Sequence, residues 1–195
     1  MLKKTLSELS ELNGGPGFEQ DVSDYIIERM KSLGIDKYYL DVMGNLFVKI
    51  EGSDPHASIV LLDAHMDEPC FMVKYIDEKG YIYVTQTGLF SSNILFGQRV
   101  RIQTPYGNIK GCFGIKSYHI SSSEGFIDPK LEDMWIDIGA TCREDVSESG
   151  IKAGYPVIFD EPFVELANDY VMGKAFDNRV GCTALIGVME DLVKE

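Results

Sequence analysis

One imidazole and one carboxylate lie two residues apart at the end of an apolar run. His65 and Asp67 follow residues 59–64, which read Ile-Val-Leu-Leu-Asp-Ala. Since side chains two positions apart on a strand point to the same side, His65 could bind a metal ion while Asp67 accepts the other ring N–H and fixes the tautomer. The pattern is short, so an alternative remains: His65 only forms a hydrogen bond at the end of a strand and binds no metal ion.

A second carboxylate comes late in the chain, directly before a predicted helix. Asp177 lies in residues 173–179, which read Gly-Lys-Ala-Phe-Asp-Asn-Arg. Its carboxylate could bridge two metal ions, because hard oxygen ligands suit Zn²⁺ or Co²⁺ alongside imidazole. The alternative is a helix N-cap, a position that aspartate fills well.

Other polar residues are weaker candidates. Glu68 follows the H-x-D pattern directly, and it either supports the site or is a solvated charge where the chain leaves the domain. His119 and His56 are interpreted as solvated loop histidines. Glu190 and Asp191 are interpreted as solvated charges on the last predicted helix, on the side opposite its apolar stripe.

Composition excludes several classes of function. The 195 residues allow one large domain or two small ones. Their 18 basic and 31 acidic residues give a net charge of −13, which argues against nucleic-acid binding. No apolar stretch approaches the ~18 residues that span a membrane, and the first residues lack the apolar core of a secretory signal. We therefore expect a cytoplasmic protein that binds neither nucleic acid nor membrane.

The four cysteines fit that expectation. They are widely spaced and form no C-x-x-C pair, so we expect reduced, partly buried thiols rather than a disulfide or a thiolate metal site. Their positions are Cys70, Cys112, Cys142 and Cys182.

Two predicted helices and three predicted strands make up the part of the chain that must position His65 and Asp67. Apolar spacing predicts helices over 2–12 and 19–33, and β-rich runs predict strands over 37–42, 46–51 and 58–64. The last run is nearly all apolar, which is typical of a strand covered on both faces. A helical start followed by such a strand predicts an α/β layer.

The middle of the chain differs from the flanking segments in its residue types and their spacing. Short runs rich in β-branched and aromatic residues, separated by turn signals, predict a small antiparallel barrel or sandwich. These runs are 71–77, 80–86, 98–104, 108–115, 134–139 and 156–160. Residues 144–154 predict a short helix or turn.

Helical character returns from residue 174 onward. The predicted apolar stripe of this last helix consists of Val180, Ala184, Leu185, Val188, Met189 and Leu192. The organisation is therefore an α/β domain built from 1–69 and 164–195, with an inserted β domain over 70–163.

Five segments in a fixed order identify a family resemblance. They are residues 17–19, 41–46, 64–68, 136–140 and 173–182. The chain resembles the N-terminal part of the TET-type or glutamyl aminopeptidase family of dinuclear zinc or cobalt metallopeptidases. The resemblance implies a zinc-exopeptidase-type mixed α/β layer, with an inserted, barrel-like all-β domain used for oligomerisation. It also implies that His65 is a terminal metal ligand, that Asp67 orients it, that Asp177 bridges two metal ions, and that the Asp177–Asn178 peptide bond is cis.

The function implied by the resemblance is metal-dependent removal of N-terminal residues from peptides, with water activated by two divalent ions (Zn or Co). The chain departs from the family at Pro69 and Cys70, and it has no counterpart of the Glu-Glu pair or of the later Asp and His ligands. We therefore expect an inactive or incomplete enzyme that forms a homo-oligomer or binds a complementing chain. The alternatives are a subunit of a split aminopeptidase completed in trans, and a non-catalytic oligomeric assembly protein.

Overall fold

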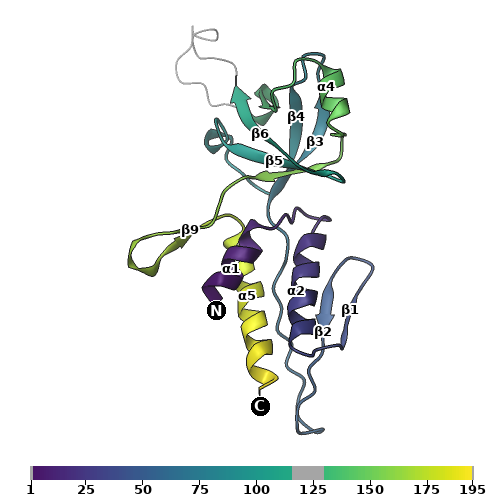
Figure 1. The fold of residues 1–195 in the computed structure, drawn as a ribbon, viewed down its shortest axis with the longest axis vertical. Coiled ribbons are helices and arrows are strands. Elements are labelled where there is room, and N and C mark those ends of the chain that lie inside the picture. The colour runs from purple at the N-terminus through teal and green to yellow at the C-terminus, as the bar shows by residue number, and fades with distance from the viewer. Residues whose placement is uncertain (1, 116–129, 195) are drawn as a thin grey trace. The chain divides into compact units, whose positions relative to one another are not determined.

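The computed structural model describes residues 2–115 and 130–194, so His119 lies outside the described residues. The chain divides into two compact units, Met1–Glu68 with Pro162–Glu195, and Pro69–Glu161. We call the first the helical unit and the second the barrel unit (Figure 1). The fold is mixed α/β with a closed barrel, as the sequence predicts. None of the helices in the described ranges is long and apolar enough to cross a membrane.

Six antiparallel strands close the barrel in the order β3-β4-β7-β6-β5-β8. They are β3 (Cys70–Ile76), β4 (Ile82–Thr87), β5 (Arg99–Thr104), β6 (Gly107–Ile115), β7 (Met134–Asp137) and β8 (Pro156–Phe159). Each lies within a few residues of a predicted strand. The described residues of this unit also form three short helices: η1 (Ser92–Ile94), η2 (Leu131–Asp133) and α4 (Arg143–Glu148).

The barrel interior is apolar because alternate residues of each strand point inward. Phe71 and Ile136 are fully buried, and Phe113 is nearly so. The Phe71 ring stacks on Phe90 at a centroid distance of 4.8 Å and meets Phe113 edge-on at 5.0 Å. Such aromatic pairs add stability beyond the area they bury.

The helical unit packs α1 (Leu2–Glu11) and α2 (Gln20–Ser32) against α5 (Phe176–Leu192). Its core includes Leu9, Val22, Met30 and Ile186. α2 ends before Gly34, which has φ +77°, a conformation that glycine adopts without strain.

Two small antiparallel hairpins complete the helical unit. The first pairs β1 (Tyr38–Leu40) with β2 (Leu46–Val48), as predicted. In its turn, Asp41 Oδ1 accepts hydrogen bonds from the N–H groups of Met43 and Asn45. The second pairs β9 (Val164–Glu165) with β10 (Val171–Met172) around η3 (Ala167–Asp169), and no sequence pattern predicted it.

The prediction of a covered strand over 58–64 is wrong on both counts. The segment joins no strand within the described ranges, and its apolar side chains are exposed rather than covered. Ile59 is 93% and Leu61 79% exposed. A strand needs a neighbour to pair its backbone groups, and no described strand pairs with this segment.

The prediction for the last helix also needs correction. The buried side of α5 carries Arg179, Cys182, Thr183, Ile186 and Glu190, whereas Val180, Val188 and Leu192 of the predicted stripe are exposed. Glu190 is not a solvated charge, because it is 6% exposed and pairs with Arg29 of α2. The helix is apolar on more than one side, so periodicity alone chose the wrong face.

Candidate metal centre

The structure brings together the three residues that the sequence singles out. His65 Nδ1 lies 3.0 Å from Asp67 Oδ1, and His65 Nε2 lies 2.9 Å from Asp177 Oδ1. His65 and Asp177 are 112 positions apart in the sequence. The imidazole is therefore held between two carboxylates, one at each ring nitrogen.

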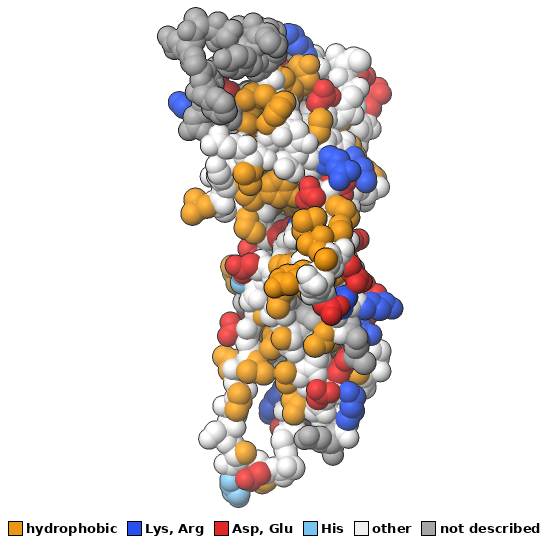
Figure 2. Space-filling model, turned by 90° about the vertical axis from the view of Figure 1, so that its left-hand side faces the viewer, with side chains coloured by type: hydrophobic (Ala, Val, Ile, Leu, Met, Phe, Trp, Pro, Cys, Tyr) orange, Lys and Arg blue, Asp and Glu red, His pale blue; other side chains and the backbone are white. Residues whose placement is uncertain are grey.

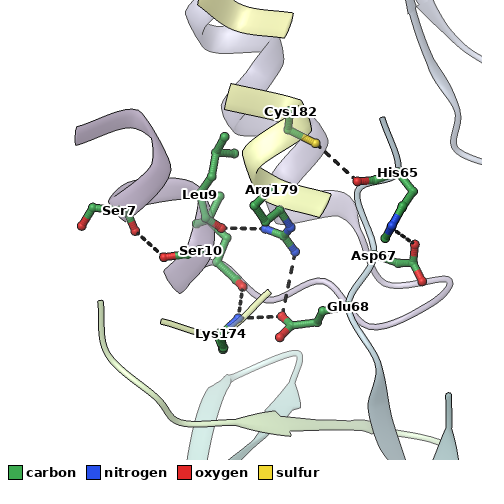
Figure 3. Close-up of polar contacts among 10 residues, drawn as sticks. Ser7, Leu9, Ser10, His65, Asp67, Glu68, Lys174, Arg179 and Cys182 are labelled. Atoms are coloured by element: carbon green, nitrogen blue, oxygen red, sulfur yellow. Dashed lines mark hydrogen bonds and ion pairs between the residues drawn. The ribbon is translucent and has the colours of Figure 1, made fainter. Parts of the chain in front are cut away.

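The orientation of His65 follows from the packing of its neighbours. Ala64 and Met66 pack against the core of the helical unit, so alternation along an extended backbone sends His65 and Asp67 to the other side. The backbone is fixed at two further points. The N–H of Glu68 donates to Gly14 O at 2.7 Å, and Cys182 Sγ donates to His65 O at 3.4 Å (Figure 3).

Asp177 reaches the imidazole because the start of α5 is irregular. Asp177 has φ −91° and ψ 101°, which are not helical values, and the Asp177–Asn178 peptide bond is cis, as the resemblance implied. The N-cap interpretation of Asp177 is wrong, because Ala175 occupies the N-cap position. Asn178 Oδ1 instead accepts the N–H of Gly181 at 3.0 Å, which leaves the Asp177 carboxylate facing His65.

The two carboxylates set the protonation of the imidazole. Burial alone would lower the pKa of His65, but hydrogen bonds to Asp177 and Asp67 raise it above its usual value. Asp67 at Nδ1 leaves Nε2 directed at Asp177, an arrangement that favours a metal ion at Nε2.

The donor set fits part of a metal site. An imidazole nitrogen and a carboxylate oxygen are both zinc ligands, and two ligands of a tetrahedral ion lie about 3.4 Å apart, close to the observed 2.9 Å. Asp177 is 95% exposed, so its carboxylate is open to further ligation. However, no group of three or more His, Cys, Asp or Glu side chains in the described ranges could hold a metal ion. Asp67 does not count as a third ligand, because it contacts the opposite ring nitrogen.

The sequence did not reveal that charged residues next to the site are buried. Glu68 is 2% exposed and pairs with Lys174 at 2.6 Å, so its interpretation as a solvated charge is wrong. Arg179 is fully buried beside them. Burial lowers the pKa of the Arg179 guanidinium, and the charge of Glu68 opposes that shift. Charged residues are exposed by default, so only the positions of Lys174 and Arg179 on either side of Asp177 could have signalled their burial.

Comparison with known proteins assigns the family. The family model for M42 glutamyl aminopeptidases matches residues 44–195. The Escherichia coli (strain K12) protein SgcX is 35% identical over 190 residues, which cover 97% of this chain and 51% of SgcX.

Two solved structures give the same result. A TET aminopeptidase from a Thaumarchaeota archaeon superposes with a TM-score of 0.91 at 33% identity, covering 99% of this chain and 54% of that one. The TET1 peptidase of Pyrococcus horikoshii, which can assemble into a tetrahedron or a large octahedral shell, gives a TM-score of 0.89 at 28% identity, covering 100% and 57%. The chain therefore belongs to the M42 glutamyl aminopeptidase family, and it spans about half the length of the relatives that it matches.

Proposed function

We propose that this chain supplies part of the metal centre of an aminopeptidase that removes N-terminal residues from peptides. The observation that carries the proposal is the placement of His65 Nε2 against Asp177 while Asp67 holds Nδ1. Family membership supports the same conclusion. None of the four cysteines, all of them in the described ranges, forms a disulfide, and this supports a cytoplasmic location.

Each of the three residues has a distinct role in the proposed site. His65 would hold one divalent ion, and Asp67 accepts the Nδ1 proton and keeps the ring in the required tautomer. Asp177 presents an exposed carboxylate that could bind a second ion through its other oxygen. When bound, two such ions, zinc or cobalt, would lower the pKa of a shared water and polarise the peptide carbonyl.

The residues that the structure describes do not complete this centre by themselves. A catalytic zinc ion takes three protein ligands plus water, and the described residues offer one imidazole and one carboxylate to the shared position. A general base that faces the site is also missing from those residues. We propose that the remaining ligands and the base come from residues beyond these 195 or from a second chain, so the 195-residue protein alone has little or no peptidase activity.

The experiment measures metal binding and turnover separately. Titration calorimetry with Zn²⁺ should show weak binding that His65→Ala abolishes. The matched control is His56→Ala, which removes an exposed loop histidine and should leave binding unchanged. Hydrolysis of aminoacyl-anilides with added Zn²⁺ or Co²⁺ should be negligible until a chain carrying the missing carboxylates and imidazole is added. Zinc binding that survives His65→Ala would reject the metal assignment.

The proposal assigns self-association to the barrel unit. One relative, the TET1 peptidase of Pyrococcus horikoshii, assembles into closed shells, and the residues of this chain that match it include the whole barrel unit. Light scattering after size-exclusion chromatography should therefore detect oligomers whose size does not change when a chelator is added. A monomer at all concentrations would contradict this role.

A further inference from the structure

Three buried charged residues lie directly behind the proposed metal centre. We call Glu68, Lys174 and Arg179 the buried charged cluster; their exposed fractions are 2%, 8% and 0%. Lys174 Nζ lies 2.6 Å from Glu68 Oε1, and Arg179 Nη2 lies 3.9 Å from the same oxygen (Figure 3). A single carboxylate oxygen therefore faces two cations in the interior of the helical unit.

The cluster joins the two segments that carry the proposed ligands. Glu68 directly follows Asp67, whereas Lys174 and Arg179 lie three residues before and two residues after Asp177. Glu68 and Lys174 are 106 positions apart, with the whole barrel unit between them in the sequence, so the ion pair joins distant parts of the chain. Isolated charges are costly to bury, so a buried pair persists only where its geometry is well fixed.

The cluster is also anchored to the end of α1. Lys174 Nζ donates to Leu12 O at 2.7 Å, and Arg179 Nη1 donates to Leu9 O at 2.6 Å. Carbonyl groups at a helix C-terminus lack partners within the helix and interact well with cations. Gly14 lies so close to the same guanidinium that an added Cβ atom would overlap Arg179 Nη2. Three separate segments therefore meet at these side chains.

We propose that Glu68, Lys174 and Arg179 are positioning residues that hold Asp67 and Asp177 on opposite sides of the His65 ring. They touch neither the proposed metal position nor a substrate, and they act by fixing the two backbone segments to each other and to α1. This inference rests on the proposed function, since its consequence is the metal affinity of His65 and Asp177. Supporting residues of this kind change metal affinity roughly 10- to 100-fold when they are replaced.

The test is a charge-balanced double variant, Glu68→Gln with Lys174→Met. The wild-type cluster has two cations and one anion, and the variant keeps Arg179 alone, so both carry one net positive charge. The variant loses the ion pair between the two segments and keeps the net charge of the cluster, and Arg179 then has no carboxylate beside it. We expect the Kd for Zn²⁺ to rise roughly 10- to 100-fold, and the imidazole ¹⁵N shifts of His65 in metal-free protein to change as its contacts to Asp67 and Asp177 loosen.

A second ion pair in the same unit, of which Glu190 is buried and Arg29 is partly exposed, provides the matched control. Arg29 and Glu190 join α2 to α5 and contact none of the proposed ligands. The variant Arg29→Met with Glu190→Gln should lower the melting temperature by a similar amount, yet leave the Zn²⁺ Kd and the His65 ¹⁵N shifts unchanged. Equal effects of the two double variants on Kd would show a merely structural role and overturn the inference.

The outcomes separate this inference from the proposed function. If His65→Ala abolishes zinc binding while the cluster variant binds zinc as the wild type does, the positioning role fails and the metal centre survives. If the wild-type protein binds no zinc, both fail. If the cluster variant does not fold, Lys174→Met alone, which leaves Glu68 paired with Arg179, replaces it, and an unchanged Kd and unchanged ¹⁵N shifts then overturn the inference.

Discussion

The interiors of the two units differ in the kinds of side chain that they bury. The barrel unit buries apolar side chains such as Phe71 and Ile136, and none of its described charged side chains is buried. Every buried charged side chain of the described ranges belongs to the helical unit, namely Glu68, Lys174, Arg179 and Glu190. The proposed metal centre lies in the unit with the charged interior. This difference indicates that the barrel interior serves stability, whereas part of the helical interior serves the geometry of a site.

The surface of the helical unit carries an exposed apolar segment. In the helical unit, four consecutive apolar residues, Ile59 to Leu62, are between 53% and 93% exposed. On the face drawn in Figure 2, hydrophobic side chains lie among acidic and basic ones. Apolar surface left in water forgoes stabilisation of about 25 cal/mol per Å². These four side chains therefore give the helical unit little burial to offset its buried charges.

Glu68→Gln should have the largest effect on stability. It leaves Lys174 and Arg179 buried without a carboxylate, and breaking a buried pair in this way costs about 3–5 kcal/mol of unfolding free energy. The only tryptophan, Trp135, lies in β7 of the barrel unit, so its fluorescence reports that unit, whereas circular dichroism at 222 nm reports mainly the helical unit. In denaturant titrations the helical transition should move and the tryptophan transition should not. Equal shifts of both would show that the units unfold together.

A matched pair of isoleucines tests the comparison directly. Ile136 in β7 is fully buried, and Ile59 is 93% exposed. Ile136→Ala should cost about 2–5 kcal/mol through lost burial and a cavity, whereas Ile59→Ala should change stability by less than about 0.5 kcal/mol. Denaturant unfolding of both variants, followed by tryptophan fluorescence and circular dichroism, gives the two values. A loss above about 1 kcal/mol for Ile59→Ala would mean that this segment is covered in solution.

The barrel could be predicted from sequence because its signal is local. Period-two alternation places residues such as Val73 and Val84 inside the barrel without knowledge of any distant residue. The segments carrying His65 and Asp177 were also found, because each lies in a recognisable family pattern. Their proximity and the cis bond were implied only by the resemblance.

The remaining features depend on contacts that no local pattern encodes. The burial of Glu68 needs Lys174, which lies 106 positions away, so the default expectation for a charge was wrong. The exposed segment 58–64 has the composition of a covered strand, yet composition does not specify the neighbour that covers it. α5 carries apolar residues on more than one side, and only the packing of α1 and α2 decides which side is buried.

Substitutions at two glycines of α5 are expected to have smaller effects on stability, and one of these glycines lies close to the proposed metal centre. At Gly181 an added Cβ would overlap Asn178 Oδ1 and lie 2.9 Å from Ala64 Cβ, next to His65. At Gly187 the close atom among the described residues is Leu2 Cδ2 at 3.0 Å, the end of a flexible side chain. Gly181→Ala should cost about 1–3 kcal/mol through overpacking, whereas Gly187→Ala should be neutral or stabilise the helix by up to about 1 kcal/mol.

Thermal unfolding followed by circular dichroism measures both glycine variants. Zinc titration adds a functional readout, because a shift of Asn178 would move Asp177 away from His65. Gly181→Ala should therefore weaken zinc binding, and Gly187→Ala should not. A Gly181→Ala variant as stable as the wild type would mean that the start of α5 is looser than the structure indicates.

The smallest expected effect is a pH dependence on the surface of the helical unit. Tyr25 donates a hydrogen bond to Glu8 at 2.6 Å. Burial, then the hydrogen bond and charge of Glu8, raise the pKa of Tyr25 from 10.0 to about 12. Because the folded state holds this proton more tightly than the unfolded state does, the stability that Tyr25 contributes is complete below pH 10 and is lost as the pH rises to about 12.

Tyr25→Phe removes the titrating group, so the helical transition of the variant should fall less steeply between pH 10 and pH 12 than that of the wild type. Tyr25 is only partly buried, so solvent screening should keep the difference below about 1 kcal/mol. Unfolding at a series of pH values, followed at 222 nm, measures it, and the tryptophan transition of the barrel unit is the internal reference, since it should be the same in both proteins. If Tyr25→Phe changed the tryptophan transition as well, the two interiors would be coupled, and the division between a stabilising barrel and a site-bearing helical unit would fail.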